Sequence, residues 1–260
     1  MKKIIFIFVS FVVAIISIDA KAEGNIFDLP DFNSGKTVWM VKAGVNFNSA
    51  VGDWKDSQKE SWEKTYKNLP LTATFPSQAG FNVSIIFNKS FGHNPLYWGM
   101  ELGIGTRGYQ ANAEWYKSTI SSGWGDEIAH RVKQNITLNT YNIEYHPFII
   151  GYKYEFLRRM AVDAHVSAFV SFDFAGNEKI YNYDYQLSSN VPREKESTND
   201  IKIGDIDKYQ RLDAGINIGV GYWLGHFNID FSWQRGFINM YDVDDKFNAQ
   251  SFKLKLGYAF

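Results

Sequence analysis

Along most of the chain, hydrophobic and polar residues alternate with a period of two, which is the pattern of a β-strand with one apolar face. Helical periodicity is nearly absent. The clearest run lies between residues 160 and 174, where every second residue is apolar and most of the others are polar: Met160, Val162, Ala164, Val166, Ala168, Val170, Phe172 and Phe174. The pattern therefore predicts an all-β protein.

The same alternation predicts about eight strands, several of them longer than ten residues. Strands of globular proteins average five or six residues, whereas a strand that crosses a membrane at a tilt needs about 9–11. The fourth strand is the least regular, and its alternation blurs from Pro147 onward, which predicts a bulge or a strand end there. The predicted strands cover residues 39–47, 81–88, 98–107, 135–151, 159–174, 211–222, 227–234 and 251–260.

The links between these strands alternate in length. Long links cover 49–77, 109–134 and 176–208, short links lie at 90–94, 153–157 and 225, and the link 236–246 is intermediate. The polar faces carry Gly, Asn, Ser and charges of both signs, which suits a narrow barrel interior. We therefore predict an up-and-down antiparallel transmembrane β-barrel over 37–260, with short periplasmic turns and long extracellular loops in the outer membrane.

The N-terminus has the features of a secretory signal peptide. Lys2 and Lys3 precede an apolar stretch over 4–18, and Ala20-Lys21-Ala22 provides small residues at a cleavage site. The stretch is too short to span a bilayer. We predict a signal peptide over 1–22 and a periplasmic N-terminal segment over 23–36; a retained N-terminal anchor is the alternative.

The composition excludes several function classes. The chain has no Cys, which rules out disulfides and thiolate metal sites, and its formal net charge of −1 does not indicate nucleic-acid binding. Aromatic residues make up 17% of the chain and gather near both ends of the predicted strands. They predict two aromatic girdles at the membrane interfaces, although sheet propensity alone would also enrich them.

Charged residues recur on the faces expected to point into the barrel. An eight-stranded barrel is just wide enough for side chains to fill, so buried charges there must pair. The near balance predicts an ion-pair plug rather than a conducting pore. The expected interior cations are Lys42, Arg107, Arg159, Arg211, Lys253 and Lys255, and the expected anions are Glu101, Asp163, Asp173, Asp213 and Asp230.

His165 lies between Asp163 and Ser167 on the same predicted face, which raises the possibility of hydrolase chemistry. Side chains two residues apart on a strand stand about 7 Å apart, too far for a direct hydrogen bond unless they are long. We therefore expect a structural histidine, and no catalytic residues. No pair of histidines has metal-ligand spacing, so neither a metal nor a cofactor is expected.

The long links are rich in aromatic residues, among them Trp54, Trp62, Trp115 and Trp124. Exposed aromatics of this kind indicate contact with an extracellular ligand, a glycan or a partner protein. The same residues could instead fold over one another, or the links could extend the strands beyond the membrane. The sequence leaves these interpretations open.

The last residues alternate and end in an aromatic ring: Phe252, Leu254, Leu256, Tyr258 and Phe260. This ending resembles the C-terminal strand signal of bacterial outer-membrane proteins, which implies recognition by the barrel-assembly machinery. The chain also resembles the PorT-like outer-membrane β-barrel family of Bacteroidota. The element Tyr141-Asn142-Ile143-Glu144-Tyr145-His146-Pro147 is similar to that family's Tyr-x-x-Ile-Pro-type strand, with Tyr145-His146 in place of Ile-Pro.

These observations favour a non-enzymatic barrel with a structural or interaction role, surrounded by outer-membrane lipid and lipopolysaccharide. Three alternatives stay open: a narrow pore for small solutes, an enzyme that modifies lipid A, and a secretion-associated factor, because the resemblance implies that one PorT-like branch assists protein secretion.

Overall fold

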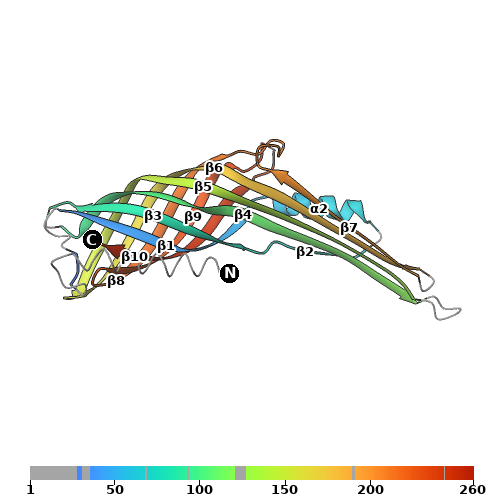
Figure 1. Cartoon of the computed structure of the whole chain (residues 1–260), viewed down its shortest axis with the longest axis horizontal. Coiled ribbons are helices and arrows are strands. Elements are labelled where there is room, and N and C mark those ends of the chain that lie inside the picture. The colour runs from blue at the N-terminus through green and yellow to red at the C-terminus, as the bar shows by residue number, and fades with distance from the viewer. Residues whose placement is uncertain are drawn as a thin grey trace.

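The computed structural model describes residues 28–30, 36–67, 69–92, 94–120, 127–188, 191–242 and 244–260. Its antiparallel sheet closes on itself (Figure 1) in the order β1-β3-β4-β5-β6-β8-β9-β10, with β10 paired again to β1 and β4 paired to β5. The predicted barrel of 8 strands is confirmed. Its strands are Thr37–Val51 (β1), Gln78–Ser90 (β3), Leu96–Ile120 (β4), Glu127–Leu157 (β5), Met160–Ser188 (β6), Leu212–Leu224 (β8), Phe227–Asn239 (β9) and Asn248–Ala259 (β10).

The alternation in sequence corresponds to the two faces of the barrel wall. In β10, Lys253 and Lys255 are buried inside, whereas Leu254 and Leu256 are exposed on the outside. In β6, the apolar residues from Val162 to Phe174 are likewise on the outer face. Apolar side chains therefore face outward and polar ones inward, the reverse of a soluble barrel.

The irregularity predicted at Pro147 is a β-bulge. Tyr145 pairs with Val170, but the next pair joins Phe148 to Ala168, so β5 contains one extra residue. The extra residue exchanges the two faces: even-numbered residues such as Glu144 point inward before the bulge, and odd-numbered residues such as Lys153 do so after it.

The outer face forms an apolar band. Leu102 and Val220, near its middle, are 57% and 56% exposed. The outward face of β6 from Val162 to Phe174, tilted by about 40°, covers about 30 Å along the membrane normal, which matches a hydrocarbon core. Exposed aromatics such as Trp39 and Tyr152 lie toward one end of the strands, with others such as Phe172 toward the opposite end. Among the described residues, no helix is long and apolar enough to cross a membrane.

Two of the predicted long links are mostly strand. β4 and β5 stay paired as far as Ile120 and Glu127, and β5 and β6 as far as Ala129 and Leu187. Two further strands, Leu71–Thr74 (β2) and Val191–Lys202 (β7), pair with the outer parts of β4 and β6. These segments, residues 71–74, 109–120, 127–138, 176–188 and 191–202, form a curved sheet that we call the arm. It projects from the end of the barrel opposite to the C-terminus (Figure 1).

One helix, Trp54–Thr65 (α2), was not expected from the sequence. It packs over the arm (Figure 1) and buries Trp54 and Trp62, which are two turns apart and so share one face. Its outer side carries the exposed i,i+4 pairs Lys59–Glu63 and Lys64–Glu60. Because only two large apolar residues mark the buried stripe, the helical period was too weak to detect.

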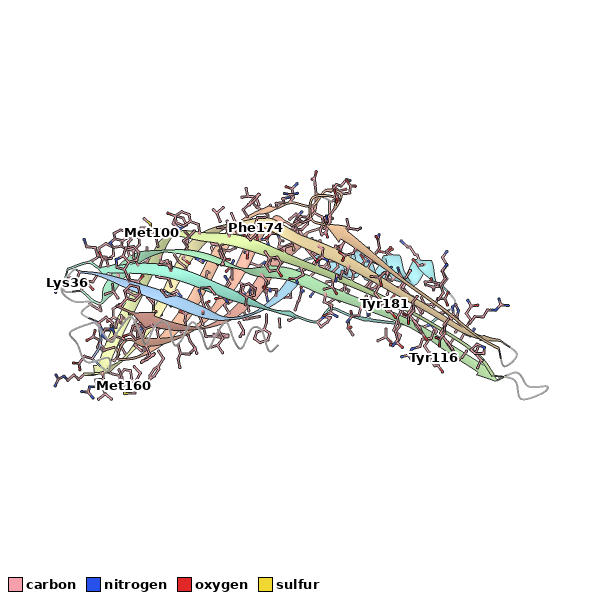
Figure 2. The ribbon with its side chains drawn as sticks, in the orientation of Figure 1. Lys36, Met100, Tyr116, Met160, Phe174 and Tyr181 are labelled. Carbon is pink, nitrogen blue, oxygen red and sulfur yellow. The ribbon has the colours of Figure 1, made fainter. Side chains whose placement is uncertain are left out.

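The side chains labelled in Figure 2 show the two ends of the molecule. Lys36 and Met160 lie at the end with the short turns, whereas Tyr116 and Tyr181 lie on the arm. The predicted signal peptide, residues 1–22, lies outside the described residues, and of the predicted periplasmic segment only 28–30 and 36 are described.

Candidate functional site

The interior at the periplasmic half holds a chain of charged groups. Lys42 Nζ lies 2.8 Å from Asp230 Oδ2. The ring of His165 bridges the two acids, with Nε2 at 3.5 Å from Asp230 and Nδ1 at 3.0 Å from Asp163. We expected residues two apart on this strand to be too distant for a direct hydrogen bond unless their side chains are long. His165 and Asp163 do meet, because their two side chains together span the distance.

Asp163 has neutral partners as well. The Tyr97 hydroxyl donates to Oδ1 at 3.0 Å, and the indole Nε1 of Trp223 donates to Oδ2 at 2.6 Å. Gly221 on the neighbouring strand makes room for this cluster, since a Cβ there would lie 2.2 Å from Asp163 Oδ2. The small residues on the inner face therefore let large polar groups pack across the barrel.

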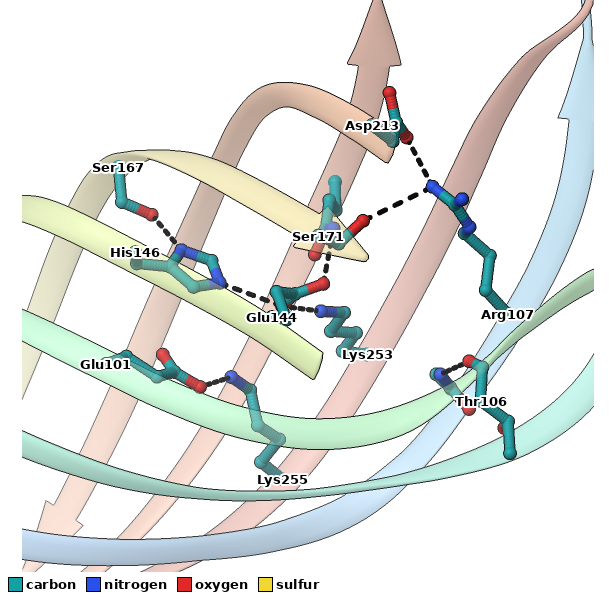
Figure 3. Close-up of polar contacts among 12 residues, drawn as sticks. Glu101, Thr106, Arg107, Glu144, His146, Ser167, Ser171, Asp213, Lys253 and Lys255 are labelled. Atoms are coloured by element: carbon teal, nitrogen blue, oxygen red, sulfur yellow. Dashed lines mark hydrogen bonds and ion pairs between the residues drawn. The ribbon is translucent and has the colours of Figure 1, made fainter. Parts of the chain in front are cut away.

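Two lysines of β10 reach across the middle of the interior (Figure 3). Lys255 Nζ lies 2.8 Å from Glu101 Oε1 on β4. Lys253 pairs with Glu144 on β5, whose other oxygen accepts a 2.7 Å hydrogen bond from the Gln234 amide. Both acids are buried, so each pair is shielded from bulk water.

Ser167, His146 and Glu144 form a row in the order of a serine hydrolase triad (Figure 3). His146 Nδ1 lies 2.8 Å from Ser167 Oγ, and Nε2 lies 2.8 Å from Glu144 Oε1. All three side chains are buried inside the barrel, and Glu144 is also occupied by Lys253. The geometry holds the ring in place but leaves it no contact with the lipid-facing surface.

Arg107 forms the last group of interior ion pairs on the side of the arm. Its Nη2 lies 2.6 Å from Asp173 Oδ2 and its Nη1 lies 2.7 Å from Asp213 Oδ2, with Ser171 Oγ at 3.3 Å. Tyr209 also donates to Asp173. The planar guanidinium group thus links β4 to β6 and β8 through two ion pairs.

Two of the expected interior cations lie elsewhere. Arg159 is in the turn between β5 and β6, where its side chain is 51% exposed and faces Asp28 at 3.5 Å. Arg211 precedes β8, is half-buried, and takes part in no ion pair with any described residue. Both assignments are wrong because the alternation was extended one residue beyond the strand. Arg159 comes directly before β6, and Arg211 comes directly before β8.

The sequence prediction missed two interior charges. Glu144 follows the alternation of β5 and could have been included, whereas Lys153 faces inward only because of the bulge at Pro147. Across the described part of the chain, no group of three or more His, Asp or Glu side chains could hold a metal. One interior cavity, bordered by Asn46 and Arg107 among others, measures about 30 Å³, room for one or two water molecules.

Aromatic residues fill the extracellular mouth of the barrel. Trp54 stacks on Phe247 with ring centroids 4.2 Å apart and meets the edge of Tyr109 at 5.2 Å. Beside them, Tyr241 and Tyr109 both donate to Glu178 Oε1, at 2.8 and 2.9 Å. Burial raises the pKa of Tyr241, and the Glu178 carboxylate raises it further, so this phenol stays a protonated donor.

The candidate loop contacts are therefore not exposed. Trp54, Trp62 and Trp115 are only 7%, 3% and 1% exposed and belong to one hydrophobic cluster. Of the interpretations that the sequence left open, exposed contacts do not hold for these three residues, because the links extend the sheet and α2 folds onto it. Trp124, the fourth, lies outside the described residues.

A recess of about 400 Å³ opens between α2 and the arm. Ser61 and Trp62 of α2, with Tyr66 just after the helix, line one wall. Trp115, Gln134 and other residues of β4, β5, β6 and β7 line the rest. Trp62 Nε1 donates to Gln134 Oε1 at 2.6 Å, and Gln134 Nε2 donates to Asn182 Oδ1 at 2.9 Å.

A family model for the outer membrane protein beta-barrel domain matches residues 32–242. The chain belongs to this family. Its location is the outer membrane, and the closed ring of alternating strands is the barrel that crosses it. Among curated proteins, none matches the chain by sequence.

Several solved outer-membrane structures align with most of the chain. Ail, the attachment invasion locus protein of Yersinia pestis, solved with the heparin analogue sucrose octasulfate, is 11% identical, with 86% of this chain and 99% of that chain covered and a TM-score of 0.31. Neisserial surface protein A is 10% identical, with 85% and 97% covered and a TM-score of 0.33. The translocator domain of the autotransporter NalP from Neisseria meningitidis is 9% identical, with 88% and 90% covered and a TM-score of 0.27. These values carry no argument about function.

Proposed function

We propose that this barrel is a non-enzymatic interaction protein of the outer membrane, which holds the arm and α2 rigidly outside the cell for contact with an extracellular ligand or partner. The observation that carries the proposal is the continuity of β4, β5 and β6, which run from the periplasmic turns into the arm without a break. Strands of this kind position a binding surface more firmly than loops do.

A narrow pore is the main alternative. The filled interior, with its ion pairs and a cavity of about 30 Å³, supports a barrel that does not conduct. Planar-bilayer recordings of the purified full chain test this: we expect no stable conductance steps, and reproducible open channels would overturn the proposal.

A lipid A-modifying activity is the second alternative. The burial of His146, Ser167 and His165 within the barrel supports a non-enzymatic role, because acyl chains and phosphates of lipid A would have to enter the interior. Lipid A mass spectra from a deletion strain and its parent should be identical. A mass difference restored by the wild-type gene but not by His146→Ala or His165→Ala would assign the activity to these residues.

The finer family placement is also part of this proposal. The element from Tyr141 to Pro147, which forms the middle of β5 and its bulge, supports a PorT-like barrel of Bacteroidota. A secretion-associated role would then appear as a loss of secreted proteins from the culture medium of a deletion strain. If the amount of secreted protein is unchanged, the secretion-associated role is excluded and the interaction role is kept.

We further propose that outer-membrane lipid and lipopolysaccharide surround the barrel and that the barrel-assembly machinery recognises β10. Leu254, Leu256 and Phe260 are exposed on the outer face, and Phe260 N donates to Trp39 O at 2.9 Å, which closes the seam between β10 and β1. Deletion of Phe260 should lower the amount of folded barrel in the outer membrane. An unaltered amount in the unboiled gel band would contradict this role.

A further inference from the structure

The recess between α2 and the arm has the size and chemistry of a ligand site. Its volume of about 400 Å³ lies within the usual range of small-molecule pockets. It is built from regular elements rather than loops, with α2 on one side and β4, β5, β6 and β7 on the other. It also lies on the extracellular half, where a soluble ligand has access.

Most of the polar groups that line the recess both donate and accept hydrogen bonds. They include the amides of Gln58 and Asn182 and the hydroxyls of Ser61 and Ser197. The hydroxyl groups of a sugar have the same double character, so such a wall can satisfy them in several orientations. A phosphate or a carboxylate would instead require a cluster of cations.

The charges of the recess balance. Its two charged side chains are Asp184 and Lys195, which are directly opposite each other in the register of β6 and β7. Asp184 also lies 3.0 Å from His130 Nε2. With no excess of either sign among the described lining residues, the recess favours a neutral ligand over a sulfated or phosphorylated one.

We propose that this recess binds a neutral saccharide of one or two hexose units, held by the amides and hydroxyls of its walls. The inference rests on the proposed interaction role and names the ligand class for it. The saccharide could be free in the medium or be part of the cell's own surface polysaccharide, and both sources present the same neutral hydroxylated rings.

Saturation-transfer NMR on the full chain in phospholipid vesicles tests the proposal, with glucose, galactose, maltose, lactose, cellobiose and N,N′-diacetylchitobiose as probes. We expect signal transfer to at least one of them. Ser61→Trp, which fills the recess from an exposed position of α2, should abolish the transfer. Glu63→Trp, on the exposed outer side of the same helix, is the matched control and should leave it intact.

If none of the six sugars receives signal, if transfer persists in Ser61→Trp, or if a sulfated disaccharide binds more tightly, the proposal is wrong. Loss of transfer when lipopolysaccharide is added to the vesicles would identify the cell surface as the source, and retention would identify a free sugar. Because conductance is measured in a separate experiment, a negative result for saccharide binding does not contradict the proposed role as a non-conducting interaction protein.

Discussion

The ion pair between Lys255 and Glu101 offers a measurement of how well water is excluded from the barrel. The two side chains are only 4% and 9% exposed, and their charged atoms lie 2.8 Å apart. Lys255→Met removes the cation and keeps the length of the side chain, so that the Glu101 carboxylate is left buried without its partner. Glu101→Gln removes the anion with little change of shape, and the double variant removes both charges.

The expected magnitude follows from the separation of the charges. At 2.8 Å the Coulomb attraction is about 6 kcal/mol for an effective dielectric constant near 20, but only about 1.5 kcal/mol in water. Desolvation offsets part of the larger value. We therefore expect Lys255→Met to lower the free energy of unfolding by about 3–5 kcal/mol, and the double variant to recover most of that loss.

The free energies should be measured by urea unfolding in phospholipid vesicles, with tryptophan fluorescence as the signal and the coupling energy taken from the double-mutant cycle. The exposed pair Lys59–Glu63 of α2, with its charges 3.9 Å apart, is the control and should give about 0.5 kcal/mol or less. If the two interior single variants each cost less than about 1 kcal/mol and their effects add, the interior is hydrated. The argument for a plugged barrel would then fail.

Three further outcomes follow from the packing. Trp62→Ala should loosen α2 from the arm at a cost of about 3–5 kcal/mol, so that limited proteolysis cuts the arm faster while the unboiled gel band of the barrel persists. Leu102→Arg, in the middle of the lipid-facing band, should destabilise the folded barrel by about 2–4 kcal/mol in vesicle unfolding; a neutral effect would place this face in water. Gly151→Val should prevent folding, as judged by the same gel shift, because a Cβ there would lie 2.2 Å from the ring of Tyr97.

The part of the fold inside the membrane could be predicted from the sequence because each of its residues has only two environments. Lipid on one side and a narrow polar interior on the other impose the strict alternation of Phe252 to Phe260 and of Val162 to Phe174. The bulge was also visible, because Pro147 interrupts that alternation and cannot donate to the ladder.

Outside the membrane this constraint ends, and the sequence became ambiguous. The sequence left open whether Trp54 and Trp62 are exposed contacts, because their burial depends on α2 folding onto a distant sheet, which no local pattern reveals. The same holds for pairs in the interior: alternation placed Glu101 and Lys255 on the inner face, but only the closure of β10 on β1 decides that they meet. The assignment of Arg159 to the interior was wrong for a local reason, since β6 begins one residue after it.

The unbroken ladders of the arm have a mechanical consequence. The hydrogen bonds between β4 and β5 continue from Leu96 and Tyr152 near the periplasmic turn to Ile120 and Glu127 at the far end of the arm. A pull on that end directed away from the cell acts along the strands, so the bonds, which lie across them, bear the load in shear and share it. Tension on a captured ligand would thus spread over the whole wall of the barrel, rather than opening the sheet one pair at a time.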